Sequence, residues 1–364
     1  MKSISKSSFF ACLLAVFGLI RCEVKEQEPL IIPSTLASFQ VEVGNEQSFD
    51  GYIFLRQIVS PGAQMMIDSR GQVKWFQASD TALFRPYAPY DKSYVALYSD
   101  KVIHDISYKG DTLVELRYGQ NGFDRLLHHE LVKDSEGNYV ALTREFIPAD
   151  LSEFGGESTD TIKTDGIIKL SATGEKLWHW SLDQEIDPLT FDGIKRVKKD
   201  WGHANALYIE EDGHYLVSWR DFNAIWKINS QTGEVIWKVG HDTFSDKTNY
   251  FYKQHGVHRN VRNEVVLFDN GDRRERGTSR AYAFRDGNPV QTTDIITLPD
   301  SLFTFKQGSV YEMGKDQWLF SSTMNKRLII TDKDGEVTWM ALSDQPFYRA
   351  YYLDSDFLKT NGLQ

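Results

Sequence analysis

The chain is built from short hydrophobic stretches that alternate with polar turns rich in Gly, Asn and Asp. The clearest unit has three such stretches, at residues 214–220, 224–228 and 233–237, and the last stretch begins with Gly233 directly after a polar turn. Short runs of β-branched and aromatic residues bounded by turn residues are typical of strands. The pattern therefore predicts a module of three consecutive antiparallel strands.

The same module recurs along the chain. Three further clear copies cover residues 52–75, 139–178 and 317–339, and two degenerate copies cover residues 94–116 and 264–295. In four of these six copies a tryptophan stands four residues after a glycine, namely Trp75, Trp178, Trp237 and Trp339. This spacing predicts a tight turn that leads into a strand whose aromatic side chain packs between neighbouring sheets.

A further strand-like segment lies between successive copies, at residues 130–132, 204–209, 256–261 and 309–311. Four strands per module and six modules predict an all-β fold, a six-bladed β-propeller with four-stranded antiparallel blades. Residues 348–353 or residues 37–43 are expected to supply the missing strand that closes the ring and removes exposed edges. Because no Pro/Gly/Ser linker divides the chain, one propeller is predicted for residues 48–364, after a tether and short strand at residues 23–47.

The N-terminal segment predicts export. Lys2 and Lys6 precede an apolar run over residues 9–20, which is too short to span a bilayer of about 30 Å as a helix. We therefore predict a secretory signal over residues 1–22 and a location outside the cytoplasm, periplasmic or anchored to the cell envelope.

Cys22 stands where a bacterial lipoprotein carries its lipidated cysteine, but Arg21 replaces the small residue that such signals place before it. Lipidation, plain cleavage and a retained anchor stay open at this point, and a lipid on Cys22 is the only membrane attachment expected. The one other cysteine is Cys12, so a disulfide framework in the folded body is excluded.

Composition narrows the choice of partners. The 364 residues include 41 Lys and Arg against 51 Asp and Glu, a formal net charge of -10. Such a field repels polyphosphates and anionic lipid headgroups, so a nucleic-acid partner is not expected.

Propeller geometry brings distant residues together. The starts of the first strands and the ends of the second strands meet at one mouth of the central channel, and the sequence places histidine, arginine and amide side chains there. The first-strand starts carry His128, His129, His203, Asn205, Gln254 and His255, and the second-strand ends include Arg220 and Asn270. Basic groups that converge in an acidic protein predict a site for a small anion.

Several of these segments resemble those of the bacterial aryl-sulfate sulfotransferases. The resemblance rests on residues 200–205, 218–220, 254–255 and 267–271, together with an opening segment over residues 50–75. It implies an exported six-bladed propeller that moves a sulfuryl group from an aryl sulfate to a phenol through a sulfated histidine, without a nucleotide donor and without a cofactor. Some members of that family also have a long N-terminal domain and a disulfide, whereas here only a short N-terminal strand and no disulfide are expected, so the resemblance does not extend to acceptor specificity.

The resemblance also implies individual roles. His255 corresponds to the nucleophile, and His203 and Arg220 correspond to contacts with the sulfate and the leaving group. One of His128 and His129 corresponds to a further channel histidine, and the sequence does not decide which. Sulfuryl transfer resembles phosphoryl transfer, in which positioning and cationic groups carry much of the catalysis, so these residue types suit the reaction.

Two other functions fit parts of the pattern. Channel histidines from different blades could hold a divalent metal ion, although Arg220 beside them would repel a cation. A non-enzymatic propeller could bind a protein or a glycan with its rim, although the distinctive residues are predicted to face the channel.

Overall fold

The computed structural model describes residues 30–80, 82–84, 86–191, 193–314 and 316–363. The chain divides into two units, Met1–Ile31 and Ile32–Gln364, and the second unit contains all the elements described below. The predicted signal over residues 1–22 and the candidate lipidation site Cys22 lie outside the described residues. Within the described ranges, no helix has the length and hydrophobicity needed to cross a bilayer.

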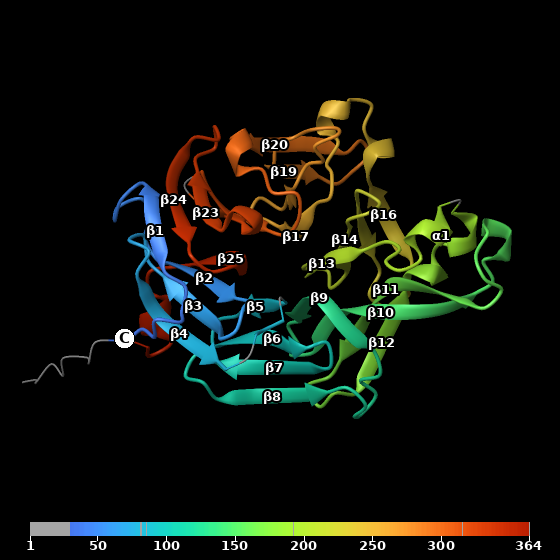
Figure 1. Ribbon diagram of the computed structural model, residues 1–364, viewed down its shortest axis with the longest axis horizontal. Helices are drawn as coiled ribbons and strands as arrows, with labels where there is room; N and C mark the ends of the chain where they lie inside the picture. Colours follow the sequence, from blue (N-terminus) through green and yellow to red (C-terminus); the bar gives the residue numbers. More distant parts are fainter. Residues whose placement is uncertain (1–29, 81, 85, 192, 315, 364) are drawn as a thin grey trace, which may run out of the picture. The chain divides into compact units, whose positions relative to one another are not determined.

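Six antiparallel sheets are arranged around a common centre (Figure 1). This confirms the predicted six-bladed β-propeller, with blades at the predicted repeats. Four blades are consecutive in sequence. The first consists of β5 (Tyr87–Pro89), β6 (Ser93–Ser99), β7 (Val102–Ser107) and β8 (Thr112–Arg117), and the second of β9 (Leu126–Lys133), β10 (Tyr139–Ala149), β11 (Asp160–Leu170) and β12 (Lys176–Ser181). The third consists of β13 (Ala204–Ile209), β14 (Tyr215–Trp219), β15 (Ala224–Ile228) and β16 (Val235–Val239). The fourth consists of β17 (His255–Arg259), β18 (Val265–Asp269), β19 (Arg280–Arg285) and β20 (Gln291–Thr297).

The other two blades join the chain ends. The C-terminal strand β25 (Phe347–Leu353) lies innermost in the blade of β2 (Tyr52–Gln57), β3 (Gly62–Ile67) and β4 (Val73–Ser79), so it closes the ring. The N-terminal strand β1 (Phe39–Val43) adds a fifth, outer strand to the blade of β21 (Ser309–Gly314), β22 (Gln317–Ser322), β23 (Arg327–Thr331) and β24 (Val337–Ser343). Both terminal segments therefore enter sheets, and the one nearer the C-terminus supplies the inner strand.

Among the described residues, helical structure is confined to single turns. Their two α-helices are α1 (Ile194–Val197) and α2 (Phe357–Thr360), and the remaining turns are short 3₁₀ segments at residues 152–154, 182–184, 188–190, 241–243, 247–249, 300–302 and 323–325. The hydrophobic cores lie between neighbouring blades, where the tryptophans of the repeat pack. The Trp75 and Trp339 indole nitrogens donate to the backbone oxygens of Tyr108 and Ser69 in the adjoining blades, at 2.9 and 2.8 Å.

The inner strands are irregular at the end where they begin. Strands β9, β13, β17 and β25 each carry extra residues relative to their neighbours, which forms a bulge. Non-glycine residues with positive φ mark the same end of five inner strands: His129, His203, Lys253, Gln307 and Arg349. A bulge redirects side chains, and a non-glycine residue with positive φ has a costly conformation that the surrounding structure must hold. Bulges and strained residues of this kind recur beside active sites. The bulges and positive φ values therefore mark the end of the ring at which the sequence predicts the anion site.

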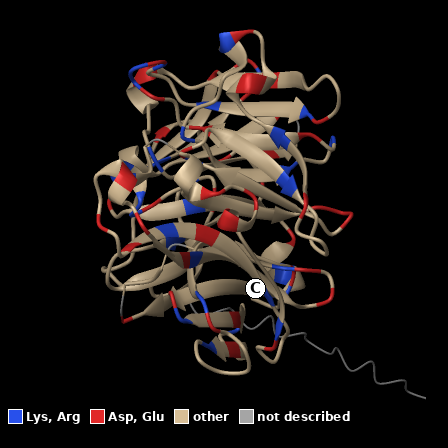
Figure 2. Ribbon diagram, turned by 90° about the vertical axis from the view of Figure 1, so that its right-hand side faces the viewer, with Lys and Arg blue, Asp and Glu red and all other residues tan. Residues whose placement is uncertain are grey.

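Charged residues of both signs are spread over the ribbon (Figure 2). Many form ion pairs at the surface, such as Arg70 with Glu46 at 2.5 Å and Arg117 with Glu115 at 2.6 Å. Exposed pairs of this kind contribute about 0–1 kcal/mol each, so the cores between blades carry most of the stability.

Candidate active site

Three histidines from three neighbouring blades have one feature in common. In His129, His203 and His255 the Nδ1 atom contacts another protein group, at 2.7, 2.5 and 2.6 Å. The ring centroids of His129 and His203 are 5.0 Å apart, and the charges of His203 and Arg220 act on His255. The structure thus brings together three imidazoles that are each anchored through Nδ1, which leaves Nε2 as the nitrogen available for chemistry.

The Asn270 amide determines the tautomer of His255. Its Nδ2 donates to the backbone oxygens of Thr304 at 2.9 Å and Gln307 at 2.8 Å, so its Oδ1 must face His255 as an acceptor. His255 Nδ1 therefore carries the proton, which it donates to Asn270 Oδ1 and to the Lys253 backbone oxygen at 3.0 Å. His255 Nε2 keeps its lone pair and accepts a 3.2 Å contact from the Gln307 backbone N–H.

Burial of the His255 ring, together with the positive charge of Arg220, lowers its pKa from 6.5 to about 3. The side chain is only 2% exposed, and its hydrogen-bond partner Asn270 carries no charge to balance an imidazolium. His255 is therefore a neutral imidazole at neutral pH, with the lone pair on Nε2 available as a nucleophile.

His203 has a different partner. Its Nδ1 lies 2.5 Å from Asp200 Oδ2, and Lys163 lies 2.9 Å from the other carboxylate oxygen. Burial would raise the pKa of Asp200, but the hydrogen bond from His203 and the charge of Lys163 hold it well below its ordinary value. Asp200 is therefore an ionised carboxylate, and a proton on His203 Nε2 has its positive charge balanced at the other side of the ring.

The structure separates the roles of the two adjacent histidines that the sequence left undivided. His128 lies within its own blade, with Nε2 at 2.9 Å from the Thr143 oxygen and 3.1 Å from Asp165 Oδ1. Its Nδ1 lies 2.7 Å from His129 Nδ1. His129 packs against His203 at the centre of the ring, and burial, together with the neighbouring positive groups, lowers its pKa well below 6.5. His129 is thus the member of the pair beside the other two imidazoles.

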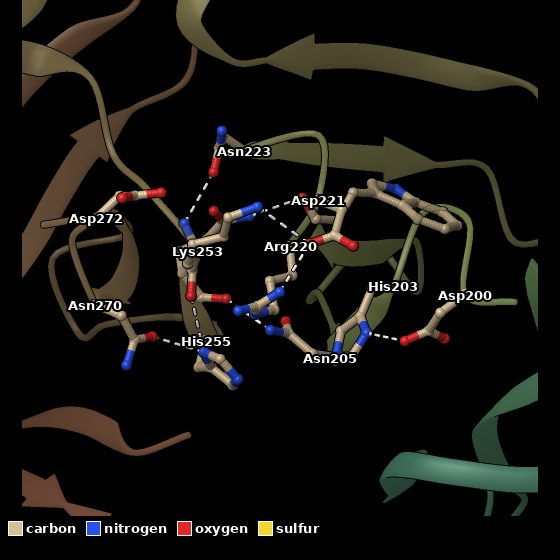
Figure 3. A network of polar contacts seen from close by, with 12 residues as sticks. Asp200, His203, Asn205, Arg220, Asp221, Asn223, Lys253, His255, Asn270 and Asp272 are labelled. Atoms are coloured by element: carbon tan, nitrogen blue, oxygen red, sulfur yellow. Dashed lines mark hydrogen bonds and ion pairs between the residues drawn. The ribbon is translucent and has the colours of Figure 1, made fainter. Parts of the chain in front are cut away.

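Arg220 completes the cluster, and Figure 3 shows its side chain near both His203 and His255. Its backbone N–H donates to the His203 oxygen at 3.1 Å, and its guanidinium Nη1 contacts Asp221 at 2.7 Å. The side chain is 21% exposed, so part of the guanidinium remains open to a ligand. One partly paired guanidinium beside the neutral imidazole of His255 produces a site that attracts an anion.

Two amides of the predicted set lie behind the histidines. Gln254 is fully buried, and its Nε2 donates to Ser218 Oγ and to the Trp219 and Ala224 oxygens at 3.1–3.2 Å. Asn205 Nδ2 donates to the Gln254 backbone oxygen at 2.7 Å. Gln254 therefore joins the blades of β13 and β17, and it fixes the backbone directly before His255.

Sequence reasoning missed a second arginine at the centre of the ring. Arg349 is 2% exposed, its Nη1 pairs with Glu130 at 2.5 Å, and its Nη2 donates to the Asn205 oxygen at 3.2 Å. Its φ of 52° matches that of His129 at 47°, because both residues occupy the bulge of an inner strand. Assigning the C-terminal segment as an inner strand and comparing it with the His129 strand would have revealed Arg349.

Other residues at the predicted mouth lie apart from this cluster. Arg144 contacts Asp100 of the adjacent blade at 3.2 Å, and His258 lies further along β17, where its ring packs 4.6 Å from that of Tyr311. Among the described residues, no group of three or more His, Cys, Asp or Glu side chains is arranged to hold a metal ion.

Comparison with known proteins gives one family match. A sequence model of the family described as Arylsulfotransferase (ASST) matches residues 40–293. That range includes all the residues predicted for the site, from His128 to Asn270. A search of curated protein sequences gives no match.

Solved structures support the fold. A protein of unknown function from Bacteroides caccae is similar with a TM-score of 0.54 and 11% identity, over 82% of this chain and 98% of that chain. The virginiamycin B lyase from Staphylococcus aureus, solved with quinupristin, has a TM-score of 0.46 and 9% identity, over 84% of this chain and 88% of that chain. At such identities the first likeness indicates a shared fold only, and the second is too weak to carry an argument.

Proposed function

Because the chain belongs to the arylsulfotransferase family, whose match makes it a sulfotransferase in general terms, we propose that it transfers a sulfuryl group from an aryl sulfate to a phenol through a sulfated His255. The observation that carries this proposal is the hydrogen-bonding of Asn270, which makes His255 Nδ1 the donor and leaves the Nε2 lone pair beside Arg220. The reaction needs no nucleotide donor in this scheme.

In the first half-reaction, His255 Nε2 attacks the sulfur of the aryl sulfate. The new N–S bond forms as the bond between sulfur and the aryl oxygen breaks, and the electron pair leaves with the phenolate. His203 Nε2 donates a proton to that oxygen, while Asp200 balances the charge on the ring. The two imidazoles have opposite surroundings, and these divide the roles of nucleophile and acid. His255, the nucleophile, lies beside an amide and an arginine, whereas His203, the acid, lies beside a carboxylate.

Charge develops on the sulfuryl oxygens during transfer, and two groups can stabilise it in this scheme. Arg220 supplies a guanidinium, and the Gln307 backbone N–H lies 3.2 Å from His255 Nε2. We expect this N–H to turn from the resting Nε2 to a sulfuryl oxygen once the N–S bond forms. Preorganised donors of this kind are worth about 10²–10³-fold in rate each.

In the second half-reaction, a phenol acceptor replaces the first product. Its oxygen attacks the sulfur of sulfated His255, the N–S bond breaks, and its proton passes to His203. The Nε2 lone pair and the starting protonation states are restored. Arg349 and Gln254 act as positioning residues in this scheme, because they hold the backbone of Asn205 and of the segment before His255.

The proposal includes where the enzyme works. Secretion by the segment over residues 1–22, with or without a lipid on Cys22, would place the protein in the periplasm or at the cell envelope. Its partners would be small aryl sulfates and phenols. Metabolic labelling with a fatty acid, compared between the natural chain and Cys22→Ser, tests the lipid.

A chromogenic phenyl sulfate, incubated with purified protein with and without a phenol acceptor, tests the reaction. We expect acceptor-dependent release of phenol that is lost in His255→Ala and retained in His214→Gln, a matched histidine substitution outside the site. Alkaline quenching after donor alone, followed by mass spectrometry, should find one sulfuryl group on the peptide that contains His255. Release without acceptor would indicate a sulfatase, and sulfation elsewhere would reject His255 as the nucleophile.

A further inference from the structure

A cavity of about 560 Å³ lies beside Arg220, and its lining differs from the rest of this acidic protein. Four cationic residues and one carboxylate line it, together with two phenylalanines and Gly271. The charged and aromatic members are Arg220, Lys253, Arg273, Arg274, Asp272, Phe303 and Phe305. A volume of this size holds a substituted aromatic molecule.

The cavity borders the proposed catalytic cluster at Arg220. Arg220 belongs to both, since its charge acts on His255 and its side chain lines the cavity. Lys253 stands two residues before His255, and its backbone oxygen accepts from the His255 ring. Figure 3 shows Lys253 and Asp272 on the side of Arg220 away from His203. A sulfuryl group held at Arg220 would therefore have its aryl ring directed toward this cavity.

The aromatic walls suit the ring of such a substrate. Phe303 is largely buried, whereas Phe305 is 51% exposed, so part of its ring is open to a ligand. Arg273 stands over the Phe303 ring at 5.0 Å, and Lys306 stands over the Phe305 ring at 5.4 Å. Each phenylalanine ring thus has a cation over one face.

Arg273 and Lys306 lack the acidic partners that the other cations have. Arg220 and Lys253 share Asp221, and Arg274 pairs with Asp272 at 2.8 Å. No ion pair formed between described residues includes Arg273 or Lys306, although both are exposed. Two cations without carboxylate partners beside the two phenylalanine rings predict a second anionic group on the ligand.

We propose that this cavity selects aromatic sulfate esters that carry a second anionic group, such as a carboxylate, at the end of the ring away from the sulfate. This inference rests on the proposed sulfuryl transfer and adds the substrate class. The sulfate would lie at Arg220, the ring would lie along Phe303 and Phe305, and the second anion would lie at Arg273 and Lys306.

Two donors of the same shape test the inference: 4-(carboxymethyl)phenyl sulfate and its neutral carboxamide. We expect the wild-type protein to show a KM about three- to tenfold lower for the carboxylate, with similar kcat, because exposed ion pairs contribute modestly. In Arg273→Gln/Lys306→Gln this preference should disappear, and in wild type it should weaken at high salt. Arg117→Gln removes an exposed cation on the outer strand β8 and should keep the preference.

The outcomes separate the two proposals. Equal KM values for the two donors, or a preference that survives the double substitution, would overturn the substrate class while leaving the transferase intact. Failure to turn over either donor would reject the proposed function, and calorimetric Kd values for both donors would then still decide whether the cavity prefers the second anion.

Discussion

Two cavities of nearly equal size lie at opposite ends of the inner strand β17, and they have opposite charge. The one beside Arg220, at the end where β17 begins, has a volume of about 560 Å³ and an excess of cations. The other, at the end where β17 finishes, has a volume of about 580 Å³ and is lined by four carboxylates and two cations: Glu210, Glu211, Asp212, Asp286, Lys227 and Arg259.

The difference lies in how the charges are paired. At the acidic end Arg259 contacts Asp286 at 2.8 Å and Glu210, and Lys227 contacts Asp212 at 2.6 Å and Glu210. Each of these two cations contacts two carboxylates, so the network stabilises the fold and leaves no unpaired positive charge to bind an anion. At the other end Arg220 shares one carboxylate with Lys253, and Arg273 has none among the described ion pairs. The pairing of the charges at each end therefore decides which of the two cavities attracts an anionic substrate.

The largest effects are expected when one arginine is substituted at each end. Arg220→Gln should lower kcat/KM for an aryl sulfate by about 10²–10³-fold, because it removes a charge beside the transferring group, with little effect on thermal stability. Arg259→Gln should instead lower the free energy of unfolding by about 2 kcal/mol, because it deprives buried Glu210 of a partner, and should leave kcat/KM nearly unchanged. Similar effects of both variants on activity would contradict the division.

A second test changes the group that holds His255. Asn270→Asp keeps an acceptor at Nδ1, but it loses the two hydrogen bonds to the Thr304 and Gln307 oxygens and adds a negative charge. The charge should raise the pKa of His255 from about 3 toward its ordinary value, so that protonation removes the nucleophile as the pH falls.

We expect a loss in kcat/KM of about 10–100-fold at pH 6, partly recovered at pH 8, whereas the wild type should show no acid limb from His255 above pH 5. Asn270→Ala provides the comparison, since it disturbs the position of the ring without adding charge. A pH profile of Asn270→Asp parallel to that of the wild type would reject the assigned contact.

A third test measures stability against pH. Because the pKa of His255 is lowered to about 3 on folding, the unfolded chain binds more protons below its ordinary pKa of about 6.5, and the free energy of unfolding falls as the pH drops from there. The expected loss is about 2 kcal/mol by pH 5. Urea unfolding at pH 7 and pH 5 should show a decline that is smaller by this amount in His255→Gln, and equal declines would show that the ring is not buried as a neutral base.

The smallest effect on activity is expected from a substitution in the acidic cavity. Glu211 is exposed and lines that cavity, so Glu211→Gln should change kcat/KM for both carboxylate-bearing and neutral donors by less than about twofold. Steady-state kinetics with the two donors checks this. A donor-specific change would mean that the acidic cavity also influences substrate choice.

Local pattern explains why so much of the fold could be predicted. Each module forms its own hairpins and places an aromatic such as Trp339 against the next blade, and these are short-range features that repeat in the sequence. The convergence of His129, His203 and His255 followed from propeller geometry once the repeat was recognised. Roles for these residues came from the family resemblance, and they remain proposals for experiment.

What the sequence by itself determined is the repeated unit, and with it the ring and the strand ends that meet at its centre, because hydrophobic alternation and turn residues act over a few neighbours. Only the tertiary structure separated His129 from His128, gave Gln254 a supporting position, and placed Arg349 and the cavity beside Arg220. The reason is physical: bulges with positive φ redirect single side chains, and the cavity is assembled from loops of different blades, so neither leaves a periodic signal in the chain.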